Sequence, residues 1–130
     1  MIQGFHHTAI RVADFDRCLE FYQKLGFTVE RSWREAPTRG MMLNGGGGSY
    51  LEVFEGGDPD APSEARMIHI ALRTKDTDTA HAAALAAGAT ERTAPKDITI
   101  PSHQGDMPAR ISFVFSPTGE IIEFFQNDLT

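Results

Sequence analysis

The chain has 130 residues, which suits one folded domain but is short for two independent ones. Its formal net charge is -6 and no cluster of lysine or arginine stands out, so nucleic acid is not expected as a partner. No membrane span of roughly 18 apolar residues and no signal peptide is visible, which predicts a cytoplasmic protein.

Cys18 is the only cysteine, which excludes an internal disulfide and a thiolate-rich metal site. A single cysteine of this kind indicates an inert thiol.

The first strand is expected over residues 5–12, where side chains alternate between two faces. One face is aliphatic and is expected to meet a helix. The other face carries His7, Ala9 and Arg11.

A helix and three further strands are expected to follow in the first half. Asp14 is suited to cap the start of the helix, and Gly26 is suited to end it. The strand patterns cover residues 27–35, 39–44 and 49–55. Four glycines, 45–48, indicate a hairpin connection, because no Lys-Ser/Thr follows them as in a phosphate-binding loop.

The second half repeats this plan with the same spacing. His69, Arg73, Asp76 and Gly88 stand in the same order and at the same intervals as His7, Arg11, Asp14 and Gly26. The second helix is rich in alanine, and later strands are expected at 111–116 and 120–126. Each half therefore reads as one βαβββ module.

We expect a single domain over residues 1–130, with modules at about 4–57 and 66–127 and a linker at about 56–65. The second module is longer, and we place its extra positions in an irregular loop at 95–110. A loop of this length either covers a site or is a plain surface excursion.

Each module also closes on an apolar strand that carries one carboxylate. Burying a charged carboxylate is costly, so each requires a cation, a hydrogen-bond network or water beside it. Together the repeats supply four matched metal ligands, His7, Glu52, His69 and Glu123. This set suits a divalent ion with one or two open positions, and it does not select among nickel, cobalt, zinc, manganese and iron.

Each of these residues also has an ordinary structural role. A lone histidine on a strand is usually hydrogen-bonded and a lone glutamate at a strand end is usually solvated, but their coincidence in both repeats favours the metal. We expect His6 to lie in packing or at the strand edge and His81 to be exposed on the second helix. His103 is expected to be either solvated or close to a substrate. Arg11 and Arg73 lie on the same strand faces as His7 and His69. These arginines bind an anionic substrate or form structural ion pairs, and the two roles are equally expected.

Three segments, HHTAIRVADFDRCLEFYQKLGF, MIHIALRTKD and PTGEIIEF, resemble the vicinal oxygen chelate superfamily, which includes glyoxalase I and bleomycin-resistance proteins. The resemblance covers essentially the whole chain. It implies an α+β fold in which two tandem βαβββ modules form a cup-shaped mixed sheet with helices on the outer face. The His, Glu, His, Glu set of glyoxalase I falls on the quartet, whereas epimerase-like members typically have Gln in place of Glu52.

The resemblance implies a metal-dependent lyase or isomerase that moves a proton next to a carbonyl. In such enzymes one divalent ion per site stabilises an enediolate. Nickel, cobalt and zinc are the metals expected most, and manganese and iron are further candidates. Glu123 is the leading base and Glu52 its counterpart, and Arg11 and Arg73 are the substrate-binding candidates. A metal-dependent epimerase and a non-catalytic small-molecule binding or resistance protein are the alternatives.

The substrate is expected to be small, and a glutathione hemithioacetal is one candidate. However, Gly56 stands where glyoxalase I is expected to have Asn, and no basic Lys-Gly-Gly-like element is present in the long loop. The resemblance also implies a homodimer, in which short family members often complete the metal site across the subunit interface.

Overall fold

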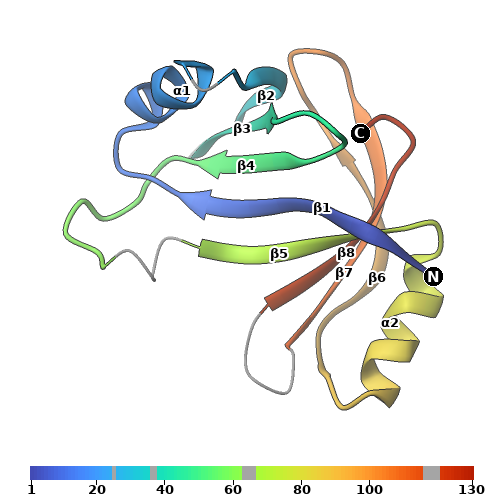
Figure 1. The fold of residues 1–130 in the computed structure, drawn as a ribbon. Coiled ribbons are helices and arrows are strands. Elements are labelled where there is room, and N and C mark those ends of the chain that lie inside the picture. The colour runs from blue at the N-terminus through green and yellow to red at the C-terminus, as the bar shows by residue number, and fades with distance from the viewer. Residues whose placement is uncertain (25, 36–37, 63–66, 116–120) are drawn as a thin grey trace. The chain divides into compact units, whose positions relative to one another are not determined.

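The computed structural model describes residues 1–24, 26–35, 38–62, 67–115 and 121–130. Figure 1 shows the elements, whose bounds are β1 (Ile2–Arg11), α1 (Phe15–Lys24), β2 (Thr28–Glu35), β3 (Thr38–Asn44), β4 (Tyr50–Phe54), β5 (Met67–Thr74), α2 (Thr77–Ala86), β6 (Thr90–Ile100), β7 (Met107–Phe115) and β8 (Ile121–Gln126). The order is βαβββ followed by βαβββ, so the predicted α+β class and the doubled module are confirmed.

The chain divides into two compact units. The first-half unit comprises His7–Ile68 and Pro101–Gly105, and the second-half unit comprises Met1–His6, His69–Ile100 and Asp106–Thr130. The first six residues pack with the second-half unit, where the Thr74 hydroxyl donates a hydrogen bond of 2.9 Å to the Met1 carbonyl.

The two units share one strand topology. The first-half unit has the order β1-β4-β3-β2, and the second-half unit has the order β5-β8-β7-β6. In each, the first and last strands of the module pair in parallel and the remaining pairs are antiparallel. The sequence repeat is therefore a repeat of strand pairing as well as of elements.

Leucine, methionine and aromatic side chains form the core of the first-half unit between α1 and its sheet. Phe15, Met41, Leu43 and Val53 are its buried members, and Ile10, Leu19 and Tyr22 are among the residues packed around them. The aliphatic face of β1 thus meets a helix, as its alternation predicted. Figure 1 shows α1 beside β2 and β3 of this unit.

The core of the second-half unit is made of smaller helix residues. Ala80 on α2 packs with Val114 and Phe124, and Leu72 and Ala84 lie around them. Because alanine projects little beyond the backbone, α2 can approach the sheet closely. The alanine-rich composition of this helix therefore serves packing.

Both helices begin at the predicted aspartates. The Asp14 carboxylate accepts a hydrogen bond of 3.0 Å from the Arg17 amide, and the Asp76 carboxylate accepts one of 2.9 Å from the Thr79 amide. These bonds satisfy amides that have no partner within the helix. The hydrogen bonds from Thr79 hold the pKa of Asp76 below its ordinary value of 3.8.

The prediction of an irregular loop at 95–110 is wrong. β6 continues to Ile100 and β7 begins at Met107, so residues 101–106 alone connect them. The extra length of the second module therefore lengthens a hairpin. Pro95 obscured the strand in the sequence; it lies between Thr93 and Lys96, where the β6–β7 register shifts and a missing amide is tolerated.

Some predicted positions lie outside the described residues. They are Leu25 at the end of the predicted first helix, 63–65 in the predicted linker, Arg66 at the predicted start of the second module, and Ser116 and Glu120 at the ends of two predicted strands. Neither described helix has the length and apolar character needed to cross a membrane.

Truncating the first-half core should destabilise the protein strongly. Leu43 is fully buried, and replacing it with alanine should lower the free energy of unfolding by about 2–5 kcal/mol, through lost burial and a residual cavity. Urea denaturation measures this. Leu129→Ala is the matched control, because Leu129 is 47% exposed; a similar loss in both variants would contradict the assigned core.

The Asp76 cap should stabilise the fold in a pH-dependent way. Its pKa is lowered on folding, so the ionised cap stabilises above about pH 3.8, and this contribution is lost as the pH falls through the lower folded pKa. Asp76→Ala should therefore unfold at lower urea concentration than the wild type at pH 7, with a smaller difference at pH 3. A difference that is equal at both pH values would contradict this role of the charge.

Candidate functional site

The first-half unit brings His7 and Glu52 into direct contact. β1 and β4 pair in parallel with His7 opposite Tyr50 and Ala9 opposite Glu52. Residues paired in this way share a face, so the histidine and the carboxylate lie on the face opposite the helix-packed core. His7 Nε2 is 3.0 Å from Glu52 Oε2, and their side chains are 0% and 12% exposed.

The second-half unit builds the same pair from His69 and Glu123. β5 and β8 pair in parallel with Ala71 opposite Glu123. His69 Nε2 is 2.9 Å from Glu123 Oε2, and the two side chains are 9% and 6% exposed. The His69 ring also meets the Phe113 ring edge to face, with centroids 5.6 Å apart.

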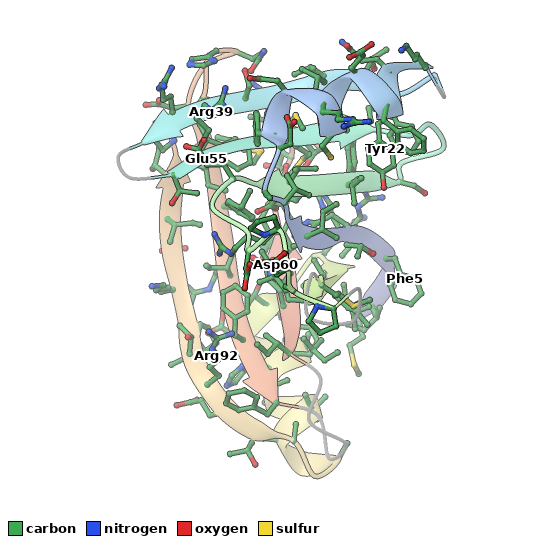
Figure 2. All side chains as sticks on the ribbon, turned by 90° about the vertical axis from the view of Figure 1, so that its left-hand side faces the viewer. Phe5, Tyr22, Arg39, Glu55, Asp60 and Arg92 are labelled. Atoms are coloured by element: carbon green, nitrogen blue, oxygen red, sulfur yellow. The ribbon has the colours of Figure 1, made fainter. Side chains whose placement is uncertain are left out.

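The two pairs are equivalent in register as well as in distance. In each unit the glutamate stands opposite the alanine that follows the histidine by two positions, Ala9 or Ala71. The predicted side-chain directions are therefore confirmed within each unit. Figure 2 draws the side chains on the ribbon.

These pairs fit a divalent metal ion by their donor atoms. Metal bonds to imidazole nitrogen and carboxylate oxygen are about 2.1 Å long, so ligands at neighbouring positions lie about 3 Å apart. The observed contacts of 3.0 and 2.9 Å have this spacing. The same spacing suits a hydrogen bond from imidazole to carboxylate, so the distance alone does not distinguish the two roles.

A third histidine–glutamate pair provides an internal comparison. His81 on α2 lies 2.9 Å from Glu91 through Nε2 and Oε2, yet the Glu91 side chain is 50% exposed. Glu91 can thus keep its charge largely in water, which Glu123 cannot do. His81 was expected to be exposed and is instead 4% exposed, because it packs edge to face against Phe124 beneath the helix.

Arg11 and Arg73 lie where strand alternation placed them. Arg11 donates a hydrogen bond of 3.1 Å to the Glu55 carbonyl and stands over the Phe54 ring, 5.7 Å from its centroid. Arg73 is half-buried and pairs in register with Phe125. Their role in substrate binding remains a prediction.

The packing of Trp33 against Phe54, on the same face as Glu52, was not predicted from the sequence. Trp33 pairs with Gly40, and its ring packs against Phe54 at 5.9 Å between centroids. A Cβ on Gly40 would come within 2.3 Å of the indole, so only glycine leaves room for this ring. Strand alternation could have indicated an aromatic contact here, because it places Phe54 on the same face as Glu52.

The remaining histidines have structural contacts. His6 is buried, with Nε2 2.6 Å from the Thr130 hydroxyl and its ring 4.5 Å from that of Phe125, which confirms its packing role. His103 is exposed, and its Nδ1 is 2.8 Å from the Ser32 hydroxyl.

Cys18 lies half-buried against the first-half core, and its burial raises the pKa of the thiol, with Asp14 adding to the rise. A raised pKa keeps the thiolate fraction low, which agrees with an inert cysteine.

Comparison with known proteins identifies the family. The sequence model of the Glyoxalase/Bleomycin resistance protein/Dioxygenase superfamily matches residues 4–124. The chain belongs to this superfamily. No curated protein sequence matches the chain significantly.

Solved structures of this superfamily fold are similar over almost the whole chain. A methylmalonyl-CoA epimerase from Mycobacterium tuberculosis matches with a TM-score of 0.69 at 19% identity, covering 98% of this chain and 89% of that one. A methylmalonyl-CoA epimerase in complex with methylmalonyl-CoA and NH4+ has a TM-score of 0.69 at 24% identity, covering 98% and 96%. The Mn(II)-bound glyoxalase from Novosphingobium aromaticivorans has a TM-score of 0.69 at 20% identity, covering 96% and 39%. At these identities the matches establish the fold.

A divalent ion should bind through the buried pairs. His69→Ala should weaken nickel, cobalt or zinc binding by more than about 100-fold, because even the loss of an outer hydrogen-bond partner costs about 10–100-fold. Isothermal titration calorimetry of the purified protein measures this affinity.

The matched control is His81→Ala, which breaks a histidine–glutamate pair of the same length on the helix side of the same unit. It should leave metal affinity unchanged while circular dichroism confirms the fold. Equal affinity in wild type and His69→Ala would show that the buried pair is a structural hydrogen bond.

Proposed function

We propose that the protein is a metal-dependent, glyoxalase-like lyase or isomerase that moves a proton on a small carbonyl substrate. The observation that carries this proposal is the buried His–Glu pair, which occurs twice at equivalent register and at 3.0 and 2.9 Å. One such pair is a common structural contact. Two equivalent pairs together supply the four donors of a divalent site in this superfamily.

In this proposal His7, Glu52, His69 and Glu123 bind one divalent ion. When bound, the ion acts as a Lewis acid that makes a proton next to a carbonyl easier to remove. The histidines remain fixed ligands, because both rings are buried and held by their strands. Four protein donors leave one or two positions for substrate oxygens.

Glu123 is the proposed base. It lies in hydrogen-bonding contact with His69, and register places it beside Phe113 of β7. Its side chain is 6% exposed, so bulk water has little access to a proton that it holds. A carboxylate so placed can take a proton from one carbon of the substrate and return it to the neighbouring carbon.

The substrate is proposed to be a small 2-oxo, 2-hydroxy or thioester compound, of which a glutathione hemithioacetal is one candidate. Arg11 and Arg73 carry positive charge on the two histidine faces and would attract its acidic groups. The family resemblance also supports a homodimer as the functional form.

An epimerase is the second candidate function. Two structures that match over nearly the whole of both chains are methylmalonyl-CoA epimerases. Epimerisation also removes and returns a proton next to a carbonyl, so the same base could serve it. Glu52 favours the glyoxalase-like reaction, because epimerase-like members typically have Gln there.

Removing the proposed base should abolish most turnover while keeping the fold. Glu123→Gln retains the shape of the side chain but cannot accept the proton, so we expect the rate to fall by about 10²–10⁴-fold. The assay follows hemithioacetal isomerisation by the nickel-, cobalt- or zinc-loaded protein, with methylmalonyl-CoA racemisation measured in parallel.

Glu91→Gln is the control for this variant, since it alters the carboxylate of the His81 pair. It should retain wild-type turnover. Full activity in Glu123→Gln would show that another group is the base, and racemisation without isomerisation would favour the epimerase.

A further inference from the structure

Arg92 on β6 occupies a β-bulge that turns its side chain toward the His69 face of the second-half unit. In the β6–β7 pairing Glu91 lies opposite Val114 and Thr93 lies opposite Phe113, which leaves Arg92 as the extra residue. Glu91 faces α2, where it contacts His81. A bulge of this kind allows two successive side chains to share the opposite face.

The Arg92 guanidinium rests on two aromatic rings of β7. Its Cζ is 5.7 Å from the Phe113 centroid and 5.8 Å from the Phe115 centroid. Figure 2 labels this side chain. The residue is exposed, and within the described part of the chain it forms no ion pair. Its charge is therefore held in place by the rings without being neutralised there.

Phe113 connects this cation to the proposed chemistry. Its ring contacts Arg92 on one side and lies 5.6 Å from the His69 ring, and its strand position is opposite Glu123. The guanidinium and the His69 ring are therefore separated by no more than these two ring distances together. A small substrate of a few carbon atoms can span that separation.

We propose that Arg92 binds an oxyanion at the distal end of the substrate, a carboxylate or a phosphate. This inference rests on the proposed function in one respect: the other end of the same molecule presents its carbonyl oxygens at the His69 and Glu123 face. The substrate class is then an anionic 2-oxo or related acyl compound, with its charge a few carbons from the reacting carbon.

The chemistry of arginine supports this assignment. A guanidinium that lies over aromatic rings keeps its N–H donors available, and these match the two oxygens of a carboxylate or phosphate. The contacts with the two phenylalanines restrict this side chain before the anion arrives, which reduces the entropy lost on binding. Lysine would retain the charge but lose the planar two-point contact.

The test compares 2-oxoadipate with 2-oxohexanoate, which has the same chain length but lacks the distal carboxylate. Both are titrated calorimetrically into the full-length protein, with and without nickel. We expect the wild type to bind the dicarboxylate about tenfold more tightly, as one charge-assisted hydrogen-bonded contact allows. Arg92→Gln should remove this preference, and Phe115→Leu and Arg92→Lys should each reduce it.

Arg17→Gln is the charge-matched control, because Arg17 is exposed on α1 in the other unit. It should keep the full preference. A second probe carries a phosphonate in place of the distal carboxylate, and comparing the two probes identifies the preferred anion. The probe that binds the wild type more tightly should lose its higher affinity over 2-oxohexanoate in Arg92→Gln.

The inference is overturned if the wild type binds both oxo acids equally or not at all. It is also overturned if Arg92→Gln keeps the preference, or if Lys96→Gln alone removes it, since Lys96 lies on the same face opposite Ile111. No turnover is measured in this experiment. An Arg92-dependent preference in a protein without isomerase or racemase activity would refute the proposed function and leave this inference standing.

Discussion

The parallel pairing between the first and last strand of each module is the constraint on which both His–Glu pairs depend. A histidine and a glutamate 45 or 54 positions apart meet only because Ala9 is opposite Glu52 and Ala71 is opposite Glu123. Shifting a strand by one residue would turn its carboxylate toward the helix and expose its aliphatic side chains. Burial of those aliphatic faces against α1 and α2 therefore fixes the register that assembles each pair.

The modules agree at this pairing and differ around it. The first-half unit places Trp33 over Gly40 beside Phe54, whereas the second-half unit places Arg92 over Phe113 and Phe115. Such differences lie on outer strands, where a bulge or a long hairpin can be accommodated without moving the central parallel pair. The repeated part thus places the same His–Glu pair in both units, while the divergent part gives the two histidine faces different aromatic and charged side chains.

Much of the fold and the faces of both His–Glu pairs followed from local patterns, because period-2 alternation and the matched His, Arg, Asp and Gly spacing report directly on strand faces and helix ends. β6 did not, since its polar residues and Pro95 mask the alternation and its bulges change the face from which later residues project. Arg92 was missed for that reason. The contact between His103 and Ser32 joins residues 71 positions apart, and no local pattern contains it.

Burial distinguishes the paired glutamates from an ordinary structural contact. Glu91 meets His81 at 2.9 Å but remains half exposed, so water can solvate its charge and the pair requires nothing further. Glu123 meets His69 at the same distance with 6% of its side chain exposed, on a strand whose neighbours are isoleucine and phenylalanine. An apolar residue there would avoid the cost of desolvating a carboxylate. Both modules carry such a carboxylate against a buried imidazole. The divalent cation proposed above would account for this cost, because it requires charged donors.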